Sequence, residues 1–483
     1  MKIDPEICYR ALVARDRRFD GVFFVGVTTT RIYCRPICPV RTPRRERCRF
    51  FTTAAAAEQE FFRPCLRCRP ELAPGNGPMD SVPRAAWLAA ARIDAGALDG
   101  EGSIESLAMQ LGMTSRQLRR VTRQELGVTP IQLAQTRRLL LAKQLLTDTD
   151  LSIIDVAFAS GFSSLRRFNS SFKSHYRLAP SDLRRSRVER GDAPIVLKLP
   201  VRLPFAWSEL IAFLGARAAA GVEAVEGDSY RRAVRLTDHR GWFAVEPTDS
   251  PHFLRVELST SLVPVLNQVL CRIRQLFDLG ARPEVIYASL VPDPVIGFLA
   301  KRWPGLRVPG AFDEFEVSLR TIVGQQVSVS AASTIMSRLV AKFGETVVTP
   351  FPLRVPCQPP LRGNGCGQYR FDHGLRTDKK RAETIVQLAR AMADRRLQLG
   401  PGMCPDKATT TLIEMPGIGE WTAQYLVMRT LRWPDAFPAT DLVLRRVLGQ
   451  GSVTRALEVA ERWRPWRAYG AMYAWKLANF AGG

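Results

Sequence analysis

The chain has 483 residues, of which 46% are hydrophobic and 24% charged, and its 69 basic against 46 acidic residues give a formal net charge of +23. This length suits about three or four domains of ordinary size. The charge favours nucleic acid or another polyanion as the partner and carries no information about the fold. There is no run of about 20 apolar residues, and the charged start Met1–Glu6 is unlike a signal peptide, so we expect no membrane span and no export. Ten cysteines in so long a chain do not indicate a disulfide scaffold, which favours reduced thiols in a cytoplasm.

Four cysteines form the first candidate site, in two close pairs: Cys34, Cys38, Cys65 and Cys68. Three residues separate the members of the first pair and two separate those of the second, and zinc ligands use both spacings. Arginines lie next to these cysteines in the sequence, which favours contact with a polyanion. From spacing alone, a purely structural zinc site is the more common interpretation.

The segment 84–186 is predicted to be helical throughout and contains an internal repeat. Ala108–Gly112 recurs as Ala157–Gly161, each with a small alanine that permits close packing and a glycine suited to a turn. A helix rich in arginine and serine follows each copy, at Ser115–Arg120 and at Ser163–Phe168. This pattern is typical of two helix-turn-helix units that present recognition helices to the major groove of DNA. A plain helical bundle is the alternative.

The next segment has the alternation of strands at Ile195–Leu199, Arg231–Leu236 and Phe253–Leu258, with a helix expected over Trp207–Ala220. We expect a small α+β domain here that has no catalytic constellation of its own. Two breaks in the sequence separate these segments. The break at 73–84 is rich in proline and glycine and precedes the helical segment, and the charged break at 185–194 precedes the α+β segment.

From about residue 295 the sequence is helical again and contains the hairpin Met415–Gly419, with Gly417 and Gly419 one residue apart. Such a hairpin between helices can bind a phosphate through its N–H groups and the following helix N-terminus, without reading the base. Asp441 follows 22 residues after Gly419 and opens a helical stretch. A helix N-cap is the more common role for such an aspartate, but the preceding hairpin favours a functional one.

Three parts of the chain resemble known families. Cys-Arg-Pro-x-Cys at 34–38 and Phe-Arg-Pro-Cys-x-x-Cys at 62–68 resemble the amino-terminal zinc domain of Ada-type methylphosphotriester acceptors. Gly161-Phe162 and Phe168–Lys173 look like the second helix-turn-helix of AraC-type DNA-binding domains. Residues 195–483 are similar to AlkA-type 3-methyladenine DNA glycosylases of the helix-hairpin-helix superfamily. This is the order of an Ada–AlkA fusion, and the Pro-Cys-His-Arg motif of the Ada methyltransferase domain is absent from the sequence.

The resemblance implies a multidomain chain that is mainly α with α+β parts. We expect a small zinc-bound α+β domain at 1–75 and an all-α double helix-turn-helix domain at 84–186. A small α+β domain like the TATA-binding protein would follow at 194–290, and an all-α helix-hairpin-helix glycosylase domain at 291–483.

In the first half, the resemblance implies that one zinc ion is held by the four cysteines and that Cys34 irreversibly accepts a methyl group from a DNA methylphosphotriester. Methylation removes one negative charge from the site, which should strengthen binding to the DNA backbone and thereby activate transcription. RNA polymerase is expected as a partner of the methylated protein. The expected DNA contacts are Ser115, Arg116, Arg119, Ser164, Arg166 and Arg167.

In the second half, the implied catalytic residue is Asp441, whose carboxylate can stabilise positive charge on the sugar or direct water. Lyase-type relatives carry a lysine at the position of Trp421, so the resemblance implies base removal without lyase chemistry. A flipped cationic purine would stack in an aromatic pocket formed by Trp421, Tyr425, Trp475 and Phe213. Gln326 would fill the gap that the flipped base leaves, and Gly417 and Gly419 would contact the DNA backbone. Apart from zinc, no cofactor is expected.

One stretch departs from the glycosylase pattern, at 348–376. It lacks apolar periodicity and carries Cys357 and Cys366. This departure leaves open the alternative that the chain is a transcription regulator whose glycosylase-like half only binds DNA. A third interpretation keeps the zinc site purely structural. We expect a bacterial, cytoplasmic and nucleoid-associated protein that acts on double-stranded DNA, with a monomer as the default.

Overall fold

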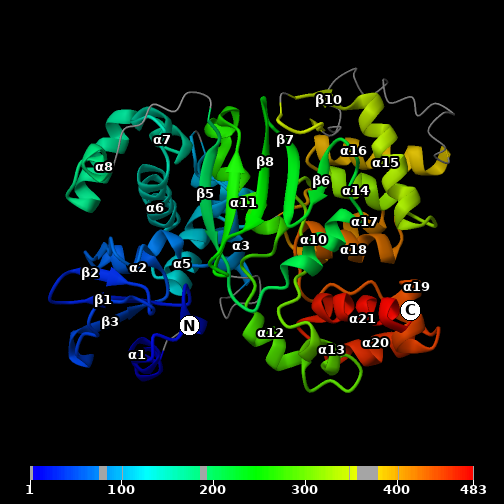
Figure 1. The fold of residues 1–483 in the computed structure, drawn as a ribbon, viewed down its shortest axis with the longest axis horizontal. Coiled ribbons are helices and arrows are strands. Elements are labelled where there is room, and N and C mark those ends of the chain that lie inside the picture. The colour runs from blue at the N-terminus through cyan, green and yellow to red at the C-terminus, as the bar shows by residue number, and fades with distance from the viewer. Residues whose placement is uncertain are drawn as a thin grey trace. The chain divides into compact units, whose positions relative to one another are not determined.

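The computed structural model describes residues 4–75, 84–100, 102–184, 193–347, 349–355, 379–400 and 402–481. The chain folds into two compact units, the first formed by Met1–Arg202 with Ser259–Cys271 and the second by Leu203–Leu258 with Arg272–Gly483. Figure 1 shows the fold and labels many of the helices and strands. Most of the two expected breaks, 73–84 and 185–194, and of the irregular stretch 348–376 lies outside the described residues, as do Cys357 and Cys366.

Unit 1 begins with a small α+β fold. Its sheet has the strand order β3-β1-β2-β4, where β1 and β2 are Phe24–Val27 and Ile32–Cys34 and β3 and β4 are Cys48–Phe51 and Arg63–Pro64. Strand β1 pairs antiparallel with β2 and β3, whereas β4 runs parallel to β2. The helical elements around the sheet are α1 (Pro5–Val13), η1 (Arg17–Phe19), η2 (Arg45–Arg47), α2 (Ala54–Gln59) and η3 (Pro70–Leu72). Aromatic side chains from this sheet and from the chain around α2 fill the core between them.

The next part of unit 1 is helical, as predicted. It consists of α3 (Arg84–Asp94), α4 (Ile104–Gln110), α5 (Ser115–Leu126), α6 (Pro130–Asp148), α7 (Ile153–Ala159), α8 (Leu165–Tyr176) and α9 (Pro180–Leu183). The repeated glycines lie in the turns after α4 and α7, where Gly112 and Gly161 have φ of +68° and +90°. Glycine is favoured at both positions because a side chain disfavours this left-handed backbone. The long helix α6 lies between the two helix-turn-helix pairs in the chain.

Unit 2 contains four antiparallel strands in the order β9-β8-β7-β6. They are β6 (Glu223–Glu226), β7 (Ser229–Leu236), β8 (His239–Pro247) and β9 (Phe253–Leu258), preceded by α10 (Trp207–Gly215). Strand β5 (Ile195–Pro200) was predicted together with β7 and β9, and all three are confirmed. We did not predict β6 or β8, and the helix over Trp207–Ala220 was predicted too long. Five consecutive buried residues in β8 explain why it shows no alternation.

The remaining elements are mostly helices. They are η4 (Thr260–Val265), α11 (Leu266–Leu276), α12 (Pro283–Leu290), α13 (Gly297–Arg302), α14 (Glu314–Val323), α15 (Val329–Phe343), α16 (Lys379–Ala393), α17 (Pro405–Ile413), α18 (Glu420–Thr430), α19 (Leu442–Gly449), α20 (Val453–Glu461) and α21 (Arg467–Ala481), with short strands β10 (Glu345–Thr346) and β11 (Arg354–Val355). Helix α14 packs against α15, α16 and α18 in one continuous hydrophobic core. Across the described ranges, every helix is too short or too polar to cross a membrane.

Candidate functional site

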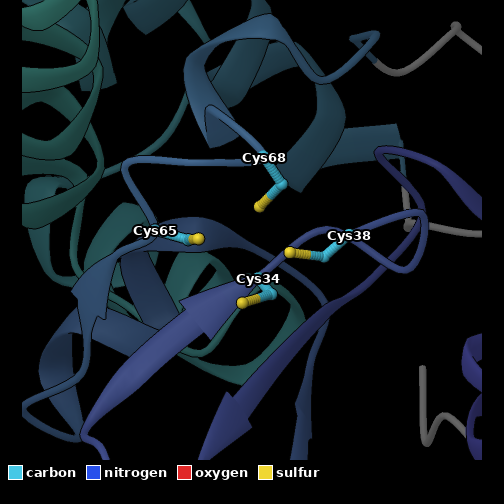
Figure 2. Close-up of side chains that lie close together, drawn as sticks. All are labelled: Cys34, Cys38, Cys65 and Cys68. Atoms are coloured by element: carbon cyan, nitrogen blue, oxygen red, sulfur yellow. The ribbon is translucent and has the colours of Figure 1, made fainter. Parts of the chain in front are cut away.

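The four predicted cysteines converge in unit 1, with their sulfurs turned toward one another (Figure 2). Cys34 ends β2 and Cys65 directly follows β4, so the parallel pairing of these strands brings the two cysteine pairs together. All four side chains are buried and their Sγ atoms lie within 4.8 Å of one another. A tetrahedron of Zn–S bonds of about 2.3 Å has S–S edges of about 3.8 Å. The cluster therefore fits a zinc ion.

Backbone contacts and one arginine fix the loops that carry these ligands. The N–H of Cys65 donates to the carbonyl of Tyr33 at 3.0 Å. The N–H of Arg35 donates to Sγ of Cys68 at 3.3 Å, and its guanidinium donates to the Cys68 carbonyl at 3.1 Å and to Asp20 at 2.8 Å. We expected the arginines beside the cysteines to favour a polyanion, but Arg35 is buried and holds the ligand loop instead.

Two other cysteines, Cys8 and Cys48, pack into the apolar core of the same fold with Phe23 and Val25. Burial raises the pKa of Cys8 to about 12 and also raises the pKa of Cys48, so both remain neutral thiols. In the cluster, by contrast, hydrogen bonds from the other three cysteines lower the pKa of Cys65, with Cys34 contributing most. Hydrogen bonds from the other three cysteines raise the pKa of Cys34 instead, so the convergence of four sulfurs, and not a shared pKa shift, distinguishes this cluster from the packed thiols.

The two expected recognition helices present their arginines to solvent. A capping box of Thr114 and Gln117 starts α5, and the Ser164 hydroxyl caps α8 by accepting the N–H of Arg167 at 3.3 Å. Leu118 and Phe168 are buried on the opposite faces of these helices. The side chains available for DNA are those of Arg116, Arg119, Arg166 and Arg167, which are exposed, and that of Ser115, which is partly exposed.

In unit 2, Asp441 caps α19 and also contacts two indoles. Its Oδ1 accepts the N–H groups of Val443 and Leu444, each at 3.0 Å. Nε1 of Trp421 donates to Oδ2 at 2.9 Å, and Nε1 of Trp475 donates to Oδ1 at 3.1 Å. Asp441 is thus a helix N-cap, and the same carboxylate is also oriented by side chains from α18 and α21, which capping does not require.

The predicted aromatic residues lie beside this carboxylate. Trp421 and Tyr425 are stacked with ring centroids 5.2 Å apart and planes 8° apart, and Tyr425 meets Trp475 edge-on at 6.3 Å. Phe213 of α10 joins the group through Arg429, whose guanidinium lies 5.2 Å from the Phe213 ring and 5.5 Å from the Tyr425 ring. The structure therefore links all four predicted aromatic residues into one group, in which Trp421 and Trp475 contact Asp441 directly.

Two arginines in this group were missed. Arg429 donates to the Tyr425 hydroxyl at 2.7 Å and to the Pro309 carbonyl at 2.6 Å, while Arg217 lies 3.7 Å from the Phe213 ring. Burial alone would raise the pKa of Tyr425, but the charges of Arg429 and Arg217 outweigh burial and lower that pKa. The spacing of Tyr425 and Arg429, four residues apart on one helix, is the signal that could have revealed the pair.

The hairpin Met415–Gly419, which precedes α18, is held in place by Gln325, a residue to which the sequence analysis assigned no role. Gly417 has φ of +85°, and a Cβ there would lie 2.1 Å from Oγ1 of Thr384, so a side chain does not fit. Nε2 of Gln325 donates to the Gly417 carbonyl at 3.0 Å. The next residue, Gln326, is exposed with φ of +58° in the turn between α14 and α15. Gln326 and the exposed Gly419 are thus placed on neighbouring turns.

Comparisons with known proteins match all three resemblances. The family described as the metal binding domain of Ada matches residues 7–71, a helix-turn-helix domain family matches 107–186, and the AlkA N-terminal domain family matches 196–313.

Relatives match the chain in whole and in part. A Mycobacterium tuberculosis protein named "Probable bifunctional transcriptional activator/DNA repair enzyme AlkA" is 40% identical over 98% of this chain and 97% of its own length. DNA-3-methyladenine glycosylase 2 of Escherichia coli is 33% identical over 56% of this chain and 94% of its own. The Escherichia coli protein Ada is 35% identical over 25% of this chain and 33% of its own.

Among solved structures, 3-methyladenine DNA-glycosylase from Archaeoglobus fulgidus covers 59% of this chain and 98% of its own, with a TM-score of 0.50 and 20% identity. At this identity, the likeness shows a shared fold.

Proposed function

We propose, from the premise that this chain belongs to the family of the bifunctional transcriptional activator/DNA repair enzyme AlkA, that it carries out two reactions on alkylated DNA. Cys34 takes a methyl group from a methylphosphotriester, and the methylated protein activates transcription. Asp441 promotes hydrolytic release of alkylated purines of the 3-methyladenine type. In this assignment residues 1–75 accept the methyl group, 84–186 read DNA, and 194–290 with 291–483 form the glycosylase.

The chemistry at Cys34 is a one-way methyl transfer. The sulfur of Cys34 attacks the methyl carbon and forms an S–C bond. The bond between that carbon and the ester oxygen breaks, and its electron pair stays on the phosphate oxygen. Bound zinc would supply the positive charge that keeps the cysteines ionised near neutral pH. The product is a thioether, so the site loses one negative charge and its repulsion of the DNA backbone falls.

Asp441 is the observation that carries the glycosylase assignment, because its carboxylate is fixed by two indole N–H groups beside stacked rings. As the bond between base and sugar breaks, positive charge develops on the sugar, and a preorganised carboxylate stabilises it. The base departs with the electron pair of the broken bond, and a water molecule adds to the sugar and loses a proton. Trp421 stands where a lyase would carry its amine and offers only an N–H that is donated to Asp441. We therefore propose that the reaction stops at the abasic site.

Methylated DNA tests both halves with the full-length, zinc-loaded protein. We expect free 3-methyladenine and abasic sites in duplex DNA, and one added methyl group on the peptide that carries Cys34. No base release would support the alternative of a regulator whose glycosylase-like half only binds DNA. A methyl group on another residue, or none, would leave the zinc site purely structural.

Double-stranded DNA is the proposed partner of both units, and RNA polymerase is the proposed partner of the methylated form. Since the substrate is chromosomal DNA, we place the protein in the bacterial cytoplasm at the nucleoid. Each site is built within one chain, so a monomer is sufficient for both reactions.

A further inference from the structure

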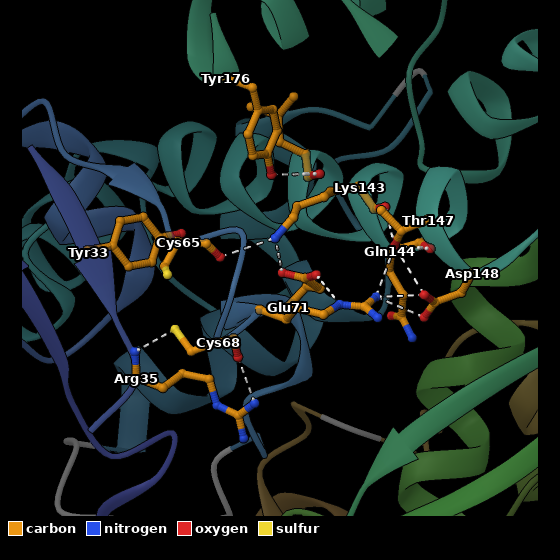
Figure 3. Close-up of polar contacts among 12 residues, drawn as sticks. Tyr33, Arg35, Cys65, Cys68, Glu71, Lys143, Gln144, Thr147, Asp148 and Tyr176 are labelled. Carbon is orange, nitrogen blue, oxygen red and sulfur yellow. Dashed lines mark hydrogen bonds and ion pairs between the residues drawn. The ribbon is translucent and has the colours of Figure 1, made fainter. Parts of the chain in front are cut away.

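A lysine of the helical part of unit 1 reaches into the zinc-binding fold. Nζ of Lys143, on α6, donates to Oε2 of Glu71 at 2.8 Å and to the carbonyl of the ligand Cys65 at 3.4 Å (Figure 3). The Lys143 and Glu71 side chains are only 2% and 1% exposed. Burying an ion pair this deeply is costly unless both charges are satisfied, so the pair points to a constraint on this junction.

Arg69 completes the junction from the ligand side. It directly follows the ligand Cys68, donates to Oε1 of Glu71 at 2.9 Å and reaches Asp148 of α6 at 2.8 Å. Its backbone is left-handed, with φ of +53°, which is unfavourable for a residue with a side chain. The second cysteine pair is thus tied to α6 by two cations that share Glu71.

The first cysteine pair is tied to the same helix through Glu58 of α2. Its carboxylate accepts the hydroxyl of Tyr33 at 2.8 Å, and Tyr33 directly precedes Cys34. The hydroxyl of Thr136, on α6, also donates to Glu58, and Nε2 of His175, on α8, lies 3.2 Å from it. Both halves of the metal site therefore contact the helical part of unit 1 through buried acidic residues.

Helix α6 is suited to pass a change onward. It follows the recognition helix α5 in the chain, and the hydroxyl of Tyr176, on the recognition helix α8, donates to the Leu139 carbonyl of α6 at 3.2 Å. A methyl group on Cys34 would enlarge the sulfur of a residue that is only 6% exposed. Packed interiors do not absorb such volume locally, so the ligand loops must shift, and rigid ties would move α6 with them.

We propose that the Lys143–Glu71 pair couples methylation of Cys34 to the orientation of the two helix-turn-helix units through α6. This coupling rests on the proposed function and adds a structural route from the methylated cluster to the helix-turn-helix units. Relief of charge repulsion at the DNA backbone would act without this pair, whereas mechanical coupling requires it. Coupling is also reciprocal, so cognate DNA would favour the arrangement that the methylated cluster adopts.

The test compares full-length, zinc-loaded proteins before and after methylation by methylated DNA. The probe is a duplex selected from random sequences by the methylated wild type. Lys143→Met with Glu71→Gln removes both charges, so neither is left buried alone. Lys198→Met is the matched control, since Lys198 is exposed on β5 of the same unit. Zinc content and the methyl group on Cys34 are measured in each protein.

We expect the wild type and Lys198→Met to bind the probe about 10-fold more tightly after methylation, a common size for coupling between sites. The double variant should take up the methyl group and gain only about 2-fold, the share that relief of charge repulsion supplies without the tie. A double variant that holds zinc, accepts the methyl group and keeps the wild-type gain would overturn the proposal. A wild type that accepts no methyl group on Cys34 would instead contradict the proposed function.

Amide hydrogen exchange of the wild type gives a second test that needs no variant. We expect methylation to change the protection of residues 139–148 in α6, while α1, which lies away from these ties in the sequence, keeps its protection. Unchanged exchange throughout α6 in fully methylated protein would overturn the proposal even if the double variant fails to fold.

Discussion

Replacing Asp441 by asparagine tests the glycosylase chemistry with little change in shape. Asparagine caps helices about as well as aspartate, so the start of α19 should persist. The carboxylate now accepts four hydrogen bonds, two from backbone N–H groups and two from the indoles of Trp421 and Trp475. An amide has one oxygen, so its NH₂ group must face an indole N–H, most simply that of Trp421.

Two costs follow from this geometry. An unsatisfied donor costs about 1–3 kcal/mol when buried, and Asp441 is only partly buried, so the effect on stability should fall at the low end. Loss of the negative charge acts on the transition state. Removing one preorganised electrostatic group costs about 3–4 kcal/mol, which corresponds to a rate loss of about 10²–10³-fold. The chemical step should therefore suffer far more than folding or DNA binding.

The assay is single-turnover release of 3-methyladenine from duplex DNA, with protein in excess and abasic sites measured in parallel. Asp313→Asn is the matched control, because Asp313 caps α14 by accepting the Glu316 N–H at 2.7 Å. We expect the control to match the wild type. If Asp441→Asn released base at more than about a tenth of the wild-type rate, the charge would contribute too little to be catalytic. An equal loss in both variants would assign the effect to capping.

Three further predictions concern the hairpin and the thiols. Gly417→Ala should lower the melting temperature and destabilise unit 2 by about 2 kcal/mol, because alanine would have to adopt a left-handed backbone and its Cβ would clash with Thr384. Gly419→Ala is the control: the space around Gly419 is open, so this variant should melt like the wild type. Cys8 has a folded-state pKa of about 12 against an ordinary value of 9.0, so its contribution to stability is complete below pH 9 and lost toward pH 12. In chemical denaturation the wild type should lose more stability over this range than Cys8→Ala, and equal slopes would contradict the assignment. Cys38→Ala should fail to retain zinc against a chromophoric chelator, while Cys48→Ala should retain it.

The zinc ligands could be found from the sequence because their signal is local. Two short spacings identify the pairs Cys34–Cys38 and Cys65–Cys68, and each pair needs only its own loop to present two sulfurs. The parallel pairing of β2 with β4, which joins the pairs, has no such signal, since β4 is only two residues long. The chemistry of the cluster could therefore be predicted, but the sheet that assembles it could not.

Residues that act through long-range contacts could not be found in this way. Lys143 lies 72 residues from Glu71, and Arg232 of β7 forms buried ion pairs with Glu223 and with Glu316, 84 residues away. In sequence, each of these is an ordinary charged residue in a helix or strand, and only burial reveals its role. The same limit explains why β8 was missed, because its buried run shows no period.

The two proposed sites differ in what holds their reactive atoms, and this difference fits their different use. In the proposed reaction Asp441 forms no lasting bond, and its four hydrogen bonds come from groups that this reaction would leave unchanged, so the carboxylate would be restored after each base is released. In the proposed reaction Cys34 keeps its methyl group, so each chain would respond once. The contacts from Tyr33 to Glu58 and from Cys65 to Lys143 lead away from the cluster toward α6, the helix through which we propose that this single response is transmitted. The contacts around Asp441 thus suit a group that acts repeatedly, whereas those around the cluster suit the coupling that we propose.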